Sequence, residues 1–281
     1  MVRRPGSTVS GHAARLCGWL VLLLLTTPGP PILAQDLVVS ARERYNEKKY
    51  DDAIELAGQA WRETRSTGAS LVLARSRLER FRLGGDASDL DAARDLLRAT
   101  DPRTLSVPER SEWELGLAAS LYLHGTYGPA SEILDRLLRE GVIAGADRER
   151  LVDWWASAVD RAGHQLGLEQ RTRAYDRLAQ RLESELARNP ASSAATYWLI
   201  EAIRGTGDLQ RAWNLGVAGW VRAGSGNTGL RDDIDRLLLQ GVIPDLAVSR
   251  TELPVDSPDT IAAMAQLALE WEATKAQWEA G

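Results

Sequence analysis

The segment whose glycine spacing could hold a phosphate group is Gly224–Gly229, which reads GSGNTG. The G-x-G-x-x-G pattern binds a pyrophosphate when it follows a β-strand and opens a helix, because the ligand then meets the free amide groups of the helix N-terminus. Here an amphipathic helical run that ends near Arg222 precedes the glycines, and no strand–helix–strand unit surrounds them. The segment is therefore predicted to be a linker between helices, and no cofactor is expected.

Groups that could act as a general base, a nucleophile or a metal ligand are few. Beyond residue 34 the only histidines are His124 and His164, forty residues apart and without cysteines or spaced carboxylates around them, so a zinc site is not expected. We find neither a G-x-S-x-G elbow nor a serine or threonine with a plausible His/Asp pair. The acid pairs Asp51-Asp52 and Asp232-Asp233 are expected in the first turns of helices, where carboxylates favour the positive end of the dipole. The chain is predicted to be non-enzymatic, with no catalytic, metal or cofactor residues.

Composition and charge exclude further classes. The 281 residues are 44% hydrophobic and 26% charged, which is ordinary for a folded globular protein and unlike a disordered chain. The formal net charge is −5; beyond the first 34 residues, which hold three arginines and no acid, 31 basic residues face 39 acidic ones, a balance of −8. A nucleic-acid-binding protein more often has a basic face, so nucleic acid is not an expected partner.

Residues 1–34 have the layout of a secretion signal. Three arginines accompany the apolar run Leu16–Leu25, prolines interrupt it, and Ala34 offers a small residue at a cleavage point before Gln35. The run is about half of the ~20 residues that a spanning helix needs, which favours cleavage over the alternative of an uncleaved membrane anchor. We expect an exported protein, periplasmic or extracellular in a bacterial-type cell, with no stable membrane span. The single cysteine, Cys17, lies inside this signal, so no disulfide is expected.

Helical periodicity organises the remaining sequence. In Ala194–Ala223, two runs with apolar residues at i, i+3 and i+4 flank the turn Gly205–Asp208, which predicts a helix–turn–helix hairpin. Similar pairs of runs occupy residues 38–61, 70–99 and 109–138. The number of residues between the third turn and the last is about twice the number between the other successive turns. A divergent pair of runs, 149–162 and 171–187, lies in this longer interval. The sequence predicts an all-α chain of about five hairpins.

The residues around the turns resemble the tetratricopeptide repeat (TPR) family. The family's alanine at the start of the second helix is matched by Ala53, Ala130 and Ala212, and its first-helix leucine by Leu117 and Leu199. The resemblance covers Gln35 to Ala223, although the spacing is longer than the family's 34 residues. It implies that residues 35–224 form an α-solenoid, a non-catalytic scaffold that binds a peptide or protein. The alternative is an irregular solenoid or helical bundle without a family identity.

Residues 225–281 depart from this pattern. The apolar spacing of Leu230–Leu238 predicts a short helix, and the chain is expected to turn at Pro244. Ser257-Pro258 is expected to begin a last amphipathic helix. A solenoid needs a terminal element over its last apolar surface, so we interpret the region as a helical cap. The alternative is a dimerisation helix, which would make the protein a self-associating structural or assembly subunit.

In TPR-like solenoids the first helix of each hairpin lines the concave surface. The resemblance then places a partner groove at Arg42, Tyr45, Arg75, Tyr122, Tyr197, Glu201 and Arg204. Tyrosine rings give rigid contact area, and guanidinium groups can hold a carboxylate of an extended peptide. Alanine at the three arginines should then weaken partner capture and leave thermal stability almost unchanged. The alternatives are that the tyrosines are core residues beside solvated arginines, or that the groove serves a small-ligand module or enzyme.

Overall fold

The computed structural model describes residues 30–141, 143–224 and 226–279, and most of the expected signal, residues 1–29, lies outside these ranges. The described residues form helices and no β-strand. The five predicted hairpins are confirmed, the divergent one included. They pair α1 (Pro30–Asn46) with α2 (Tyr50–Thr64), α3 (Thr67–Gly84) with α4 (Ala87–Ala99), α5 (Val107–Leu123) with α6 (Tyr127–Glu140), α7 (Gly145–Gly163) with α8 (Leu168–Arg188), and α9 (Ser193–Thr206) with α10 (Leu209–Ala223).

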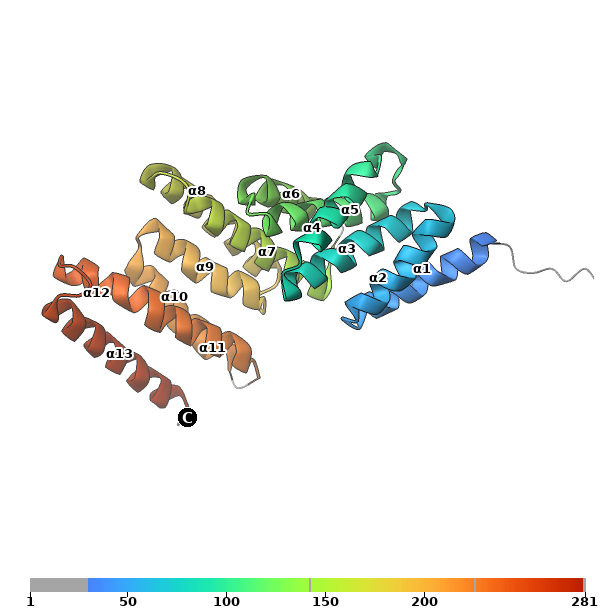
Figure 1. The fold of residues 1–281 in the computed structure, drawn as a ribbon. Coiled ribbons are helices and arrows are strands. Elements are labelled where there is room, and N and C mark those ends of the chain that lie inside the picture. The colour runs from blue at the N-terminus through green and yellow to red at the C-terminus, as the bar shows by residue number, and fades with distance from the viewer. Residues whose placement is uncertain (1–29, 142, 225, 280–281) are drawn as a thin grey trace, which may run out of the picture.

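The pairs follow one another along an α-solenoid, from α1 at one end to the last helices at the other (Figure 1). First helices pack on first helices: α1 on α3, α3 on α5, and α7 on α9. The helices α5 and α7 approach each other less closely, and α7 packs mainly on α6 and α9. The array therefore widens on its first-helix side between the third and fourth pairs.

Caps and turn residues fix the helix ends. The side chains of Ser66 and Asp86 accept backbone N–H groups at the starts of α3 and α4. Gly85 and Gly207 end α3 and α9 with φ of 75° and 90°, a left-handed conformation that glycine adopts without a steric cost. Short polar connections therefore fold each helix back on its predecessor.

The apolar core is divided into three clusters of buried side chains. One small cluster joins α1, α2 and α3 around Ala41 and Val72, and a second joins α3, α4 and α5 around Leu71 and Leu97. The third is much larger and runs continuously from α5 to the last helix. Small residues on the second helices, such as the fully buried Ala57, let the paired helices approach closely.

Polar contacts also join helices within a pair and between neighbouring pairs. Asp89 of α4 is fully buried and accepts hydrogen bonds from Arg77 and Arg80 of α3, and Arg80 also donates to Asp51 of α2 over 2.9 Å. Further along, Glu149 of α7 accepts the backbone N–H of Ala194 over 2.7 Å at the start of α9. These contacts set the orientation of one pair against the next.

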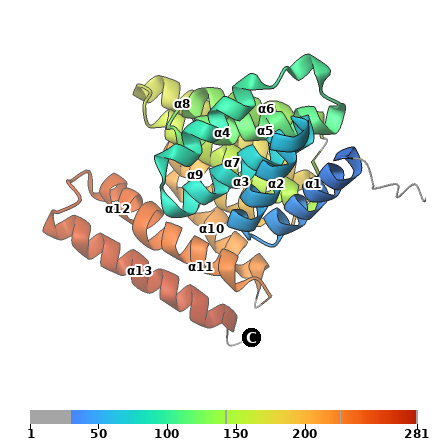
Figure 2. The same ribbon diagram turned by 45° about the vertical axis from the view of Figure 1, so that its right-hand side comes forward.

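The C-terminal region forms one further pair of helices. Helix α11 (Thr228–Leu237) continues through a π-helical segment (Leu238–Val242) into α12 (Ile243–Thr251), and α13 (Pro258–Glu279) packs on α12. In Figure 2, α11, α12 and α13 form the orange and red layer at one end of the molecule. Within the described ranges, no helix combines the length and the apolarity that crossing a lipid bilayer requires.

Two details of this region differ from the sequence interpretation. The helix does not break at Pro244: the amide of Ile243 bonds to the carbonyl of Leu238, and this wider π turn accommodates a proline ring that would clash in a regular helix. In addition, α11 begins at Thr228, capped by Asn227, so Asp232 and Asp233 lie beyond its first turn. The glycine-rich connection runs between α10 and α11, as predicted, with Ser225 outside the described residues.

Replacing Gly205 by alanine is expected to lower the free energy of unfolding by about 1–3 kcal/mol, as overpacking does. A Cβ at this position of α9 would lie 2.6 Å from ring atoms of Tyr175, whose hydroxyl is held by Asp160 at 2.6 Å. The steric cost outweighs the helix propensity gained from alanine, about 1 kcal/mol. Urea unfolding measures the effect. In Gly128→Ala, where the added Cβ meets nothing within 4 Å, stability should be unchanged or slightly higher.

Candidate functional site

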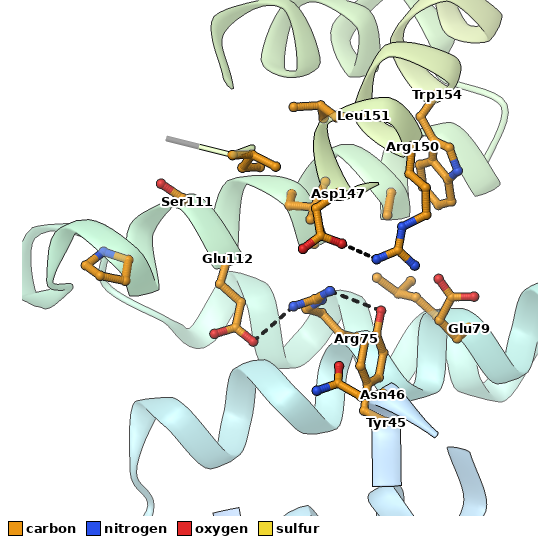
Figure 3. A pocket seen from close by; sticks show the side chains of 16 residues that line it. Tyr45, Asn46, Arg75, Glu79, Ser111, Glu112, Asp147, Arg150, Leu151 and Trp154 are labelled. Carbon is orange, nitrogen blue, oxygen red and sulfur yellow. Dashed lines mark hydrogen bonds and ion pairs between the residues drawn. The ribbon is translucent and has the colours of Figure 1, made fainter. Parts of the chain in front are cut away.

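A pocket of about 470 Å3 opens between α1, α3, α5 and α7 (Figure 3). Its apolar wall consists of Leu78, Leu115, Ile143, Leu151 and Trp154. Its charged side chains are Arg75, Glu79, Glu112, Asp147 and Arg150. The pocket lies where α5 and α7 spread apart, on the side of the first helices.

Arg75 lies at the centre of the polar half of this pocket, as Figure 3 shows. It donates hydrogen bonds to the Tyr45 hydroxyl over 3.1 Å and to Glu112 over 3.3 Å, and its guanidinium lies 4.6 Å from the centre of the Tyr45 ring. Burial acts to lower the pKa of Arg75, but Tyr45 and Glu112 outweigh it and raise the pKa. The guanidinium is therefore charged and held in one position by α1 and α5.

Most charges of this pocket are already paired. Glu112 also accepts two hydrogen bonds from Arg42, at 2.8 and 3.1 Å, so two guanidinium groups share one carboxylate. Arg150 pairs with Asp147 on the same helix, and Glu79 pairs with Arg82. The lining itself holds two guanidinium groups and three carboxylates, and a local positive excess arises only around Glu112, which Arg42 and Arg75 share. Such a pocket favours an apolar group that carries, or lies next to, a negative charge.

The seven residues predicted for the groove fall into three places. Arg42, Tyr45 and Arg75 meet around Glu112 at the pocket just described. Tyr122 lies beyond its far wall: its ring stacks on Trp154 with centroids 5.5 Å apart.

The remaining three, on α9, form a separate group. Tyr197, Glu201 and Arg204 line a second pocket together with residues of α7 and α11. Arg204 bonds to Glu201 over 3.0 Å and to Asp245 of α12 over 2.7 Å.

The sequence interpretation missed the residues that α7 contributes, Asp147, Arg150, Leu151 and Trp154, and also Glu112. The turn between α7 and α8 lacks the repeat pattern, so the positions that face the groove in the TPR family could not be matched to residues of α7. Glu112 lies on a first helix, and this position was the signal that could have identified it as a groove residue. Its pairing with Arg42 could not be predicted, because the two residues are 70 positions apart in the sequence.

These contacts change what we expect from the arginine substitutions. Arg75 and Arg204 each bridge to other helices, and their side chains are 25% and 28% exposed, so alanine there should lower stability as well as binding. Arg42 is 42% exposed, and without it Glu112 would still pair with Arg75. Of the three variants, Arg42→Ala should therefore change stability least and report most directly on binding.

The pH dependence of stability should reveal Glu201. Burial is the main cause that raises the pKa of Glu201, and Asp160 and Asp245 add to it against the opposing Arg204. A raised pKa means that the neutral form favours the fold; this contribution is complete below the unfolded-state pKa and is lost as pH rises through the folded-state pKa. Glu201→Gln, neutral throughout, should therefore gain stability relative to the wild type as the pH rises above the ordinary pKa of a glutamate, 4.5. Denaturant unfolding at several pH values measures the difference, and a change in the opposite direction would contradict this assignment.

Comparisons with known proteins found similarity among solved structures alone. No protein-family model matches the chain, and no curated protein matches it. Among solved structures, the chain is similar to a kinesin light chain-like protein of Podospora anserina with nearly identical TPR-like repeats, at 16% identity and a TM-score of 0.47, over 75% of this chain and 99% of that one. A glutamine-to-methionine variant of that protein gives 16% identity and a TM-score of 0.46, over 75% and 97% of the two chains. Both of these solved structures are TPR-like repeat proteins.

Proposed function

We propose that the protein is an exported, non-catalytic scaffold that holds an extended segment of a protein partner against its first helices. The observation that carries this proposal is the pocket between α1, α3, α5 and α7, with an apolar wall and a fixed polar half. A smaller pocket of about 90 Å3 adjoins it and shares Tyr45, Arg75 and Glu112, so the recess continues along the array. A continuous recess suits a chain better than a compact ligand. Export is supported by residues 1–34 of the sequence.

Site-specific photo-crosslinking in the native cell tests this function. A photoreactive amino acid placed at Ser111, on the pocket lining, should capture a protein that the same group at Asp95 does not. Asp95 is a suitable control because its side chain is 79% exposed on α4, a second helix. Capture from both positions, or from neither, would contradict a groove-binding role.

A blocking variant supplies the complementary measurement. Ser111→Trp adds bulk at the pocket lining and removes one hydrogen bond, from the serine hydroxyl to the Val107 carbonyl. It should therefore leave the melting temperature nearly unchanged while it reduces recovery of the captured partner by about tenfold. Unchanged recovery would place the partner outside this pocket.

A second candidate function is self-association through α13. Its outer side exposes Ile261 and Leu269, whose exposed fractions are 51% and 71%. Exposed apolar side chains on one face of a helix are typical of a contact surface. Light scattering of the full mature chain distinguishes the two functions: a stable homo-oligomer that Leu269→Glu converts to a monomer would favour the assembly role.

A further inference from the structure

The second pocket, between α7, α9, α11 and the π-helical segment, differs in chemistry from the first. Its volume is about 230 Å3. Two aromatic rings from α9, Tyr197 and Trp198, line it, with centroids 5.3 Å apart and planes at 89°. Asp160 of α7, Glu201 of α9 and Asp233 of α11 contribute carboxylates. The pocket therefore combines ring faces with negatively charged groups.

The ion pairs around this pocket leave negative charge in excess. Arg204 is shared by two carboxylates, Glu201 and Asp245. Asp160 accepts its 2.6 Å hydrogen bond from the neutral hydroxyl of Tyr175. Asp233 pairs with Arg236, and together four carboxylates face two guanidinium groups.

Two ionisable groups of the pocket, Tyr197 and Glu201, have raised pKa values. The pKa of Tyr197 is raised, first by burial and then by the carboxylates of Glu201, Asp233 and Asp160. The pKa of Glu201 is also raised, although Arg204 lies beside it. Burial is the largest cause of both shifts, and the neighbouring carboxylates act in the same direction.

The π-helical segment lies against Arg204, the guanidinium that Glu201 and Asp245 share at the edge of the pocket. Gly241 belongs to this segment, and a Cβ there would lie only 3.0 to 3.2 Å from the guanidinium atoms of Arg204. The absence of a side chain at Gly241 thus lets the Arg204 guanidinium lie against the helix backbone, from which it reaches Asp245. Single-turn π segments inside helices are rare and frequent at functional sites.

We propose that this second pocket binds an arginine side chain of the segment that the groove holds. The inference rests on the proposed function. An arginine guanidinium can lie against the faces of Tyr197 and Trp198 and donate to the carboxylates, a combination that an uncharged side chain cannot make. The first pocket has a local positive excess where Arg42 and Arg75 share Glu112, and the second has a local negative excess where Glu201 and Asp245 share Arg204, so a segment with opposite charges at its two ends would suit both.

The test uses Nα-acetyl-L-arginine methylamide as the probe and the citrulline analogue as its uncharged isostere. Binding is followed by NMR at the indole N–H of Trp198, which donates to Asp153 over 2.8 Å and is assigned by its loss in Trp198→Phe. At pH 7.5 and low salt, the arginine probe should bind the mature protein at least about fivefold more tightly than the citrulline probe. Equal affinities for the two probes would overturn the proposal.

Matched double variants separate this pocket from the overall negative charge. Asp160→Asn with Glu201→Gln removes two charges and keeps an oxygen that can accept from Tyr175 and from Arg204. Asp95→Asn with Glu183→Gln removes two charges at exposed positions outside the pocket. The first pair should abolish the preference for arginine, and the second should retain it. Equal losses in both would overturn the proposal, and if the first pair fails to fold, the two probes on the wild type decide.

The outcomes also distinguish this proposal from the function on which it rests. A partner captured at Ser111 but no preference for the arginine probe would leave the groove function standing and refute the arginine pocket. Selective binding of the arginine probe without capture at Ser111 would support the pocket chemistry and refute the scaffold role.

Discussion

Replacing Trp271 by alanine is expected to lower the free energy of unfolding by about 3–5 kcal/mol, the range for removing a buried aromatic side chain. The Trp271 side chain is fully buried and contacts Trp220 and Trp213 edge to face, with centroids 5.5 and 6.2 Å apart. Its indole N–H donates to Asp235 over 2.7 Å, and this joins α13 to α11. The substitution therefore leaves a cavity and loosens the final helix, and Asp235 keeps only Lys275 of its two donors on α13.

Two control variants test this prediction: one at another tryptophan of the same helix, and one with a different side chain at position 271. Trp278 is 56% exposed, so Trp278→Ala should change stability by less than about 0.5 kcal/mol. Trp271→Phe keeps most of the volume and loses the hydrogen bond, and it should fall between the two. Urea unfolding gives the free energies, and limited proteolysis at the exposed connection Glu252–Asp256 reports whether α13 detaches. If alanine at both tryptophans costs the same, Trp271 does not anchor α13.

Replacing Glu185 by alanine is expected to lower the free energy of unfolding by about 3 kcal/mol, because Glu185 is the one carboxylate among the described residues that pairs with Arg148 and Arg181. The Glu185 side chain is 5% exposed and accepts three hydrogen bonds from Arg148 of α7, at 2.8 to 3.1 Å. Arg181 lies 3.6 Å from the same carboxylate, and two of its nitrogens are buried without a hydrogen-bond partner. Without Glu185, two largely buried guanidinium groups would repel each other.

Glu183 provides the matched control two residues away on α8. It pairs with Arg211 at 2.6 Å, but both side chains are about half exposed, so Glu183→Ala should cost less than about 1 kcal/mol. Denaturant unfolding of the two variants measures the contrast. A difference below about 1 kcal/mol would mean that the arginines of the cluster reach water once Glu185 is gone.

The helices could be predicted from the sequence because each hairpin carries its own local signal. Apolar spacing and a glycine-containing turn identified α9 and α10, and similar signals identified the pairs before them. The divergent fourth pair was found from the doubled step between turns. Local patterns failed at Pro244, because the π turn that accommodates it has no sequence signal of comparable strength.

The candidate site was only partly predictable, because its geometry depends on contacts between distant repeats. The family pattern pointed to Arg42, Tyr45 and Arg75, which do meet in space. The carboxylate that organises them, Glu112, comes from a different pair of helices, and the apolar wall at Trp154 comes from the divergent one. The separation of α5 and α7, which opens the pocket, arises from packing over several helices and is not encoded in any one repeat.

The division of the core into three clusters has a thermodynamic consequence. In a linear array, stability is approximately the sum of the intrinsic terms of the repeats and the coupling between nearest neighbours. Here the two small clusters at α1–α5 contribute weak terms, and the large cluster contributes strong ones, so the free chain should fray from its N-terminal end. A segment that fills the pocket between α1, α3, α5 and α7 and the smaller one adjoining it would meet Val72, Leu78 and Leu151, one residue from each cluster. Because the segment binds only the folded pairs of helices, part of its binding free energy would add to the coupling between neighbouring pairs. The free chain would then unfold gradually, and the chain with an occupied groove would unfold as one cooperative unit.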